Sequence, residues 1–138
     1  MNPVLDMNSA NRLINPFKFS EETNVNGKNF VIKYTKRANK ALQKRTSQLI
    51  IEMQIYFSCV VQKRVLFHDS YKREMTSVND KMAVALRVVE SDSCDPDYYA
   101  NNHPEKRELD SNAAKKMTAK ELILDYKDGN WIANFKIA

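Results

Sequence analysis

Apolar and polar side chains alternate most regularly between Ile51 and Phe67. Every second position in this stretch is apolar except Lys63, and mostly polar residues fill the positions between them. A period of two places alternate side chains on opposite faces of a β-strand. The pattern predicts one long strand over about 49–67 with one face in a core. Because most strands are shorter than about ten residues, we expect a bend or β-bulge near Lys63.

A helix over 38–66 is the alternative for this region. Leu42, Leu49, Met53 and Tyr56 also keep a helical spacing. The enrichment in Ile, Val, Tyr and Phe favours the strand, because β-branched and aromatic side chains pack well on a pleated surface.

Two further segments show the patterns of strands. Phe30, Ile32 and Tyr34 alternate with less apolar residues and predict a short strand over 28–35. Residues 82–89 are apolar on almost both faces, which is typical of a strand in the middle of a sheet.

The C-terminal segment predicts a β-hairpin. Asp128-Gly129 separates two apolar runs, and a two-residue Asp-Gly loop favours a type I′ turn. Such a turn places apolar residues opposite one another on one face, which agrees with a packed hairpin. The expected pairs are Tyr126 with Trp131, Leu124 with Ala133, and Leu122 with Phe135.

The remaining segments have weaker patterns. Residues 36–47 predict a short surface helix or an irregular basic connector, and Ser111-Asn112 could begin a second short helix. Only two glycines are present, which suggests long polar connections in place of tight turns. We expect residues 1–27 to form an N-terminal arm that packs on a single β-rich domain of residues 28–138, with a long polar loop over 90–117.

The predicted fold is therefore mainly β, with an α+β fold as the alternative. We expect about five mostly antiparallel strands in one curved sheet or partial barrel, with one or two short helices. A sandwich also remains open. The 138 residues, of which 43% are hydrophobic and 28% charged, suit a single globular domain.

The cysteine content and the N-terminal residues indicate where in the cell the protein is expected. Two cysteines are too few for a disulfide scaffold, and Cys59 lies on the apolar face of the predicted strand. The first residues lack the basic and apolar regions of a signal peptide, and no run of 18 apolar residues occurs. These features predict a cytoplasmic protein with no membrane contact.

The basic residues are concentrated in one part of the chain. Residues 28–81 hold twelve Lys and Arg against four acidic residues, a net charge of +8 within a chain of +5. Such a surface, with aromatic rings beside it, suits nucleic acid or an acidic protein, although a solvated face without a partner is the alternative. The candidate contact residues are Lys33, Tyr34, Lys36, Arg37, Lys40, Lys44, Arg45, Tyr56 and Arg64.

Within the long predicted strand, we expect the polar face that carries Glu52, Gln54, Tyr56 and Arg64 to be the binding face. The predicted function is accordingly that of a small binding protein rather than an enzyme, without a cofactor.

Two other functions remain open. A metal-dependent or redox enzyme could use His68 together with the loop 90–103, but the spacing matches no known zinc motif. The potential ligands in that loop are Cys94, Asp95, Asp97 and His103. A homo-oligomeric assembly subunit could instead pair through an edge strand of the C-terminal hairpin, which predicts a homodimer.

Overall fold

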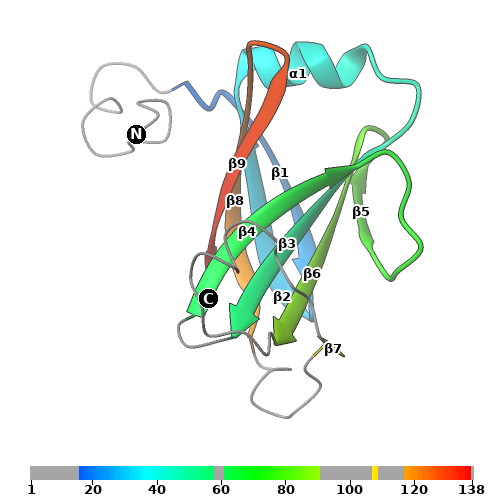
Figure 1. Ribbon diagram of the computed structural model, residues 1–138. Coiled ribbons are helices and arrows are strands. Elements are labelled where there is room, and N and C mark those ends of the chain that lie inside the picture. Colours follow the sequence, from blue (N-terminus) through cyan, green and yellow to red (C-terminus); the bar gives the residue numbers. More distant parts are fainter. Residues whose placement is uncertain (1–15, 58–60, 91–106, 109–116, 138) are drawn as a thin grey trace.

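The computed structural model describes residues 16–57, 61–90, 107–108 and 117–137. Two mixed sheets face each other as a sandwich, and one helix lies across its end (Figure 1). The mainly β prediction is confirmed. The strands are divided between two sheets, however, so the prediction of about five mostly antiparallel strands in one sheet is wrong.

The first sheet brings together both ends of the described chain. Its order is β1-β2-β8-β9, with β1 and β2 paired antiparallel, β2 and β8 parallel, and β8 and β9 antiparallel. The strands are β1 (Phe19–Val25), β2 (Lys28–Tyr34), β8 (Ala119–Lys127) and β9 (Asn130–Ile137).

The second sheet repeats this plan with the middle of the chain. Its order is β4-β3-β6-β5, with the parallel pair β3 and β6 at its centre, and the short strand β7 also pairs with β6. The central position predicted for residues 82–89 is confirmed. The strands are β3 (Leu49–Phe57), β4 (Val61–His68), β5 (Thr76–Asn79), β6 (Met82–Glu90) and β7 (Arg107–Glu108).

The predicted long strand over 49–67 is a hairpin of β3 and β4. Phe57 pairs with Val61, and the register continues without a shift to Ile51 opposite Phe67, so there is no β-bulge at Lys63. Odd-numbered residues therefore pair with odd-numbered residues. Paired side chains lie on the same face of a sheet, so the alternation continues in phase from one strand to the other.

Two tight turns use the only two glycines of the chain. Asp128-Gly129 has φ values of 54° and 80°, as a type I′ turn requires, and every predicted pair of the C-terminal hairpin is confirmed. Asn26-Gly27 has φ values of 53° and 77° and joins β1 to β2. Residues 19–27 thus belong to a sheet rather than to an arm, and the expectation of long connections in place of tight turns is wrong.

The core lies between the two sheets. The odd-numbered face of β3 is buried there from Leu49 to Ile55, as predicted, with Phe57 partly buried, and it packs against apolar side chains of β2, β8 and β9. Completely buried members of this core include Phe30, Ile32, Ile51, Met53, Ile55, Leu122 and Leu124.

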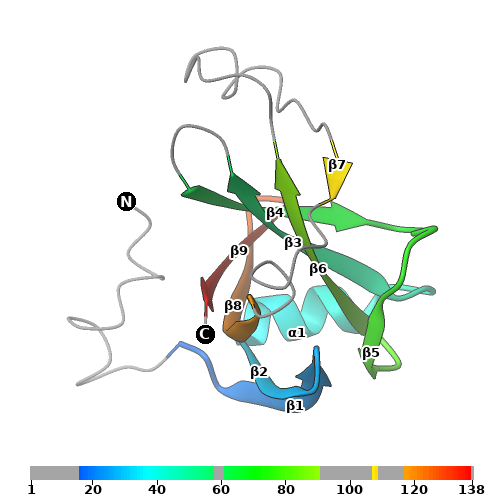
Figure 2. The same cartoon turned by 90° about the horizontal axis from the view of Figure 1, so that it is seen from below.

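The helix α1 (Lys36–Gln43) is the first of the two alternatives left open for residues 36–47, a short surface helix rather than an irregular connector. It begins at Thr35, whose side-chain oxygen accepts a hydrogen bond from the Ala38 amide at 3.1 Å. Ala38 and Leu42 are buried in the core, so the rest of the helix faces outward. In the view from below, α1 lies behind the space between the two layers, at the far end of the sandwich (Figure 2).

Two predictions concern the outside of the fold. In the described ranges, no helix is long and apolar enough to span a membrane. Strand β9 lies at an edge of its sheet, which is where the homodimer prediction places the contact, and that dimer remains a prediction. Cys59, Cys94 and the proposed helix at Ser111 lie outside the described residues.

Candidate functional site

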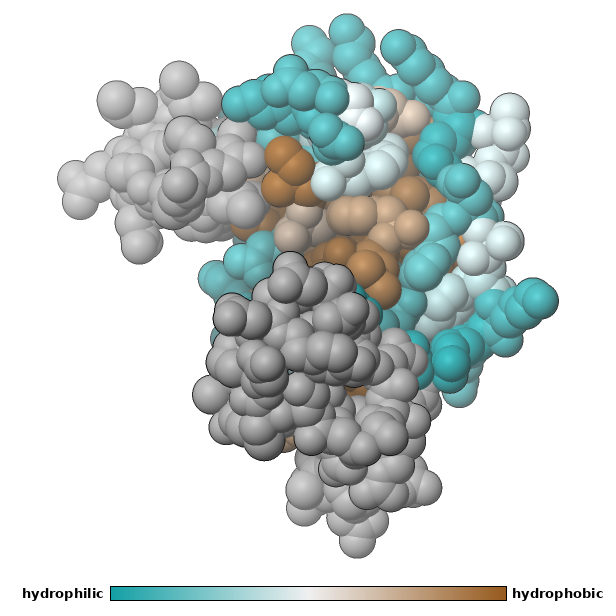
Figure 3. Space-filling model, viewed as in Figure 1, coloured by the Kyte–Doolittle hydropathy of each residue, from teal (hydrophilic) through white to brown (hydrophobic). Residues whose placement is uncertain are grey.

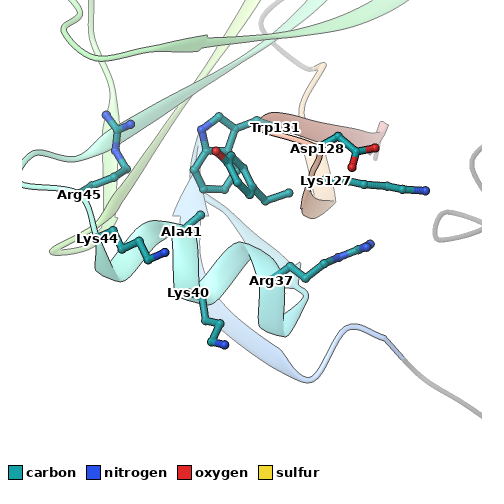
Figure 4. A pocket seen from close by; sticks show the side chains of 9 residues that line it. Arg37, Lys40, Ala41, Lys44, Arg45, Lys127, Asp128 and Trp131 are labelled. Carbon is teal, nitrogen blue, oxygen red and sulfur yellow. The ribbon is translucent and has the colours of Figure 1, made fainter.

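A basic cleft of about 540 Å³ lies between α1 and the tip of the β8–β9 hairpin (Figure 4). The indole of Trp131 lies in its middle, with Lys44 and Arg45 on one side and Lys127 and Asp128 on the other. The residues that line the cleft are Arg37, Lys40, Ala41, Lys44, Arg45, Tyr126, Lys127, Asp128 and Trp131.

The helical repeat explains why the basic residues gather here. Arg37, Lys40, Ala41 and Lys44 are spaced three, four and seven residues apart, so they share one side of α1 and its C-terminal end. Ala38 and Leu42 occupy the side that is buried in the core. Folding of α1 onto the core therefore presents a row of cations to the hairpin.

The type I′ turn explains why two aromatic rings meet the helix. Tyr126 and Trp131 form a directly opposed pair near the turn, and their ring centroids are 4.6 Å apart with the planes inclined at 61°. This edge-to-face geometry is favourable for aromatic pairs. Both side chains are partly exposed, so their rings form an apolar wall of the cleft.

Asp125 attaches the start of the helix to β8. Its carboxylate is completely buried and accepts hydrogen bonds from the Thr35 hydroxyl at 2.6 Å and from Arg37 Nε at 3.2 Å. The Thr35 amide also donates to the carbonyl of Leu124. These bonds fix the distance between the two walls of the cleft.

The cations of the cleft differ in how they are engaged. Arg37 is paired with Asp125, and Arg45 contacts Asp69. Lys40, Lys44 and Lys127 are exposed, and none of the three has an acidic partner within the described part of the chain. Among the described residues, one carboxylate, that of Asp128, lines the cleft against five cations. The cleft is therefore electropositive.

The structure brings together four of the nine residues predicted for binding: Arg37, Lys40, Lys44 and Arg45. Lys36 is exposed on the same helix but does not line the cleft. Lys33 lies on β2, where it forms an ion pair with Glu121 at 3.2 Å.

The two tyrosines predicted to stack on bases are buried. Tyr34 stacks on Phe19 with the ring centroids 5.4 Å apart, and Tyr56 is completely buried beneath the guanidinium group of Arg64. Neither ring can receive a base in this arrangement. The aromatic residues beside the cations are the partly exposed Tyr126 and Trp131, and the signal for them was the hairpin register, which makes them a pair next to Lys127.

The polar face of β3 is not an open binding face either. Glu52 and Gln54 are 3% and 0% exposed, respectively. The Glu52 carboxylate accepts hydrogen bonds from the Gln54 amide and, at 3.2 Å, from Arg87 Nη1, while Arg64 Nε donates to Gln54 at 2.8 Å. These polar side chains therefore form a buried network on β3, β4 and β6.

His68 belongs to the same network. Its Nε2 lies 2.7 Å from Glu52 Oε1. Burial by itself would raise the pKa of Glu52, but hydrogen bonds from Gln54, His68 and Arg87, together with the charge of Arg87, hold this pKa below its ordinary value. Because an ionised carboxylate only accepts hydrogen bonds, the Nε2 of His68 carries the proton in this contact.

The lowered pKa of Glu52 predicts a pH-dependent stability. A carboxyl group that is more acidic when folded stabilises the protein fully above its ordinary pKa of 4.5, and this contribution is lost as the pH falls through the folded value. We expect the difference in unfolding free energy between the wild type and Glu52→Gln to be constant near neutral pH and to shrink below pH 4.5. Urea unfolding at several pH values measures it, and a difference that stays constant under acid conditions would contradict this assignment.

The described residues offer little support for a metal centre. They contain no group of three or more His, Cys, Asp or Glu side chains that could hold an ion. The loop residues predicted as ligands, Cys94, Asp95, Asp97 and His103, lie outside the described residues.

Comparisons with protein-family models, curated proteins and solved structures give no match for this chain.

Proposed function

We propose that the protein binds nucleic acid through the cleft between α1 and the β8–β9 hairpin. The observation that supports this function is the convergence of five cations around Tyr126 and Trp131. A row of phosphates suits this arrangement, because lysine and arginine that neutralise phosphates release counterions into solution. The engaged cations Arg37 and Arg45 fix the shape of the cleft, and the lysines supply mobile positive charge.

An acidic protein partner is the alternative for the same charges. Carboxylates would satisfy the lysines equally well, but they make no particular use of exposed aromatic rings. Nucleobases have flat π-faces that stack on tyrosine and tryptophan, and proteins that bind nucleic acid combine such rings with a basic groove. The position of Trp131 among the cations therefore favours nucleic acid.

The three unpaired lysines provide the first test of this function. Replacing Lys40, Lys44 and Lys127 together with alanine should weaken binding on the order of ten- to a hundred-fold at low salt. The slope of log affinity against log salt should also fall by about two, because each phosphate contact on a single strand contributes roughly 0.7. Fluorescence anisotropy of a labelled oligonucleotide between about 50 and 200 mM salt measures both quantities.

The matched control replaces Lys18, Lys28 and Lys120, which are equally exposed but do not line the cleft. It removes the same charge and should leave the affinity close to that of the wild type. Equal losses in the two triple variants would show that binding follows net charge rather than the cleft. Absence of any binding at low salt would refute the function, and competition by poly-glutamate at equal charge would point to an acidic protein instead.

A further inference from the structure

Three aromatic rings from three strands form a row that leads out of the cleft. Trp131 on β9 contacts Tyr126 on β8 at 4.6 Å between ring centroids, and it also contacts Phe67 on β4 at 6.4 Å. The row therefore crosses from one sheet to the other. Tyr126 and Trp131 line the cleft, whereas Phe67 lies beyond it.

The row continues into an apolar area between the two sheets. Strands β4 and β9 are edge strands of different sheets and make few contacts with each other, apart from Lys63 Nζ, which donates to the carbonyl of Phe135 at 2.6 Å. Apolar side chains at this seam are only partly buried. Figure 3 shows apolar surface in the middle of this face, with hydrophilic side chains around it. The partly buried residues of the seam are Val65, Phe67, Trp131 and Ala133.

We propose that the nucleic acid is single-stranded and that one of its bases stacks on Trp131. This inference rests on the proposed function and specifies its ligand. The backbone of the strand lies along Lys40, Lys44 and Lys127, and the bases face the aromatic row. Cations on both sides of partly exposed rings suit a flexible strand, because its phosphates contact the lysines while its unpaired bases reach the rings.

Duplex nucleic acid would leave half of this surface unused. In a duplex the bases stack on each other and present only their edges in the grooves, while the phosphates form the outer surface. The lysines of the cleft would contact such a molecule, but the flat faces of Tyr126 and Trp131 would meet no base. The combination of ring exposure and positive charge is therefore explained by a single strand and not by a duplex.

Trp131 is the only tryptophan of the chain, which makes it a direct reporter. A single-stranded oligonucleotide of about twelve residues should quench its fluorescence as it binds, because the indole becomes covered by a base. The same sequence as a duplex should bind more weakly at equal salt and quench little. DNA and RNA forms of the single strand serve as separate probes.

Two substitutions separate stacking from packing. Trp131→Leu retains an apolar side chain but removes the ring, and it should weaken single-strand binding roughly ten-fold or more. Trp131→Phe retains a ring and should keep most of the affinity. Anisotropy of a labelled strand measures both, and thermal unfolding shows whether each variant is folded. A Leu variant that is folded and binds like the wild type would overturn the stacking assignment.

The outcomes distinguish this inference from the function on which it rests. The single-strand inference would be overturned if single strand and duplex bound equally and neither quenched Trp131. If replacement of the three lysines still abolished that binding, the proposed nucleic-acid binding would stand. Absence of binding by both forms would overturn the two together. We expect the single strand to quench the fluorescence of Trp131. We also expect its affinity to fall in the Leu variant but not in the Phe variant.

Discussion

Replacing Glu52 with alanine should lower the free energy of unfolding by about 3–5 kcal/mol, the cost typical of removing one partner from a buried ion pair. Glu52 is the shared acceptor for Gln54, His68 and Arg87, and Arg87 is itself only 8% exposed. Without this carboxylate, the guanidinium group of Arg87 keeps its desolvation cost and loses its ion pair with Glu52. Urea unfolding at neutral pH measures the change.

Two controls show whether the loss comes from the network. Glu22→Ala removes an exposed carboxylate from β1 and should change stability by less than about 0.5 kcal/mol. Arg87→Ala should cost much less when Glu52 is already alanine than in the wild type, because the two side chains share one interaction. If the losses of stability from Glu52→Ala and Arg87→Ala were additive, the interaction between these two side chains would not contribute to the free energy of unfolding.

Asp125→Ala should both destabilise the protein and weaken binding. Each hydrogen bond to a charged group contributes roughly 1.5–3 kcal/mol, and Asp125 accepts such bonds from Thr35 and Arg37. The Arg37 side chain is 48% exposed, so water screens its bond to Asp125 and replaces part of the lost interaction in the variant. We therefore expect each lost bond to lower the free energy of unfolding by an amount in the lower half of this range. Denaturant unfolding gives the stability, and oligonucleotide anisotropy gives the affinity.

The effect on binding separates geometry from charge. Removing Asp125 makes the cleft more positive, so charge alone would strengthen binding, whereas release of the helix from β8 would weaken it. Asp128→Asn is the matched control. It removes an exposed carboxylate from the cleft and keeps a residue that tolerates the positive φ of the turn. This control should strengthen binding slightly, and stronger binding by Asp125→Ala would contradict the anchoring role.

The parts of the fold that were predictable are those with a local cause. The Asp128-Gly129 turn determines its own register, and the odd face of β3 could be assigned to the core from its alternation alone. Asn26-Gly27 is a similar turn signal between Val25 and Phe30. Strand β1 before it was not predicted, because its residues are mostly polar and show no apolar alternation. The position of α1 followed from the spacing of Ala38 and Leu42.

The division into two sheets was not predictable from such patterns. It depends on the parallel pairs β2 with β8 and β3 with β6, which join segments far apart in the chain without a turn to mark them. The candidate site shows the same limit. The cations of α1 follow one another in the sequence, but Trp131 lies beside them through tertiary contacts such as that of Asp125 with Arg37, 88 positions apart.

The in-phase pairing of β3 and β4 constrains how this chain can vary in length. Three residues separate the paired Phe57 and Val61, and the side chains that pack in the core from both strands, such as Met53 of β3 and Phe67 of β4, are odd-numbered. One additional residue within β4 ahead of Arg64 would exchange the two faces of the strand beyond it, turning Arg64 inward and Phe67 outward, unless a bulge absorbed it. The connection before Val61 has no such limit, because hairpin loops of about two to five residues all occur, so a single added residue is tolerated there but not within the strand.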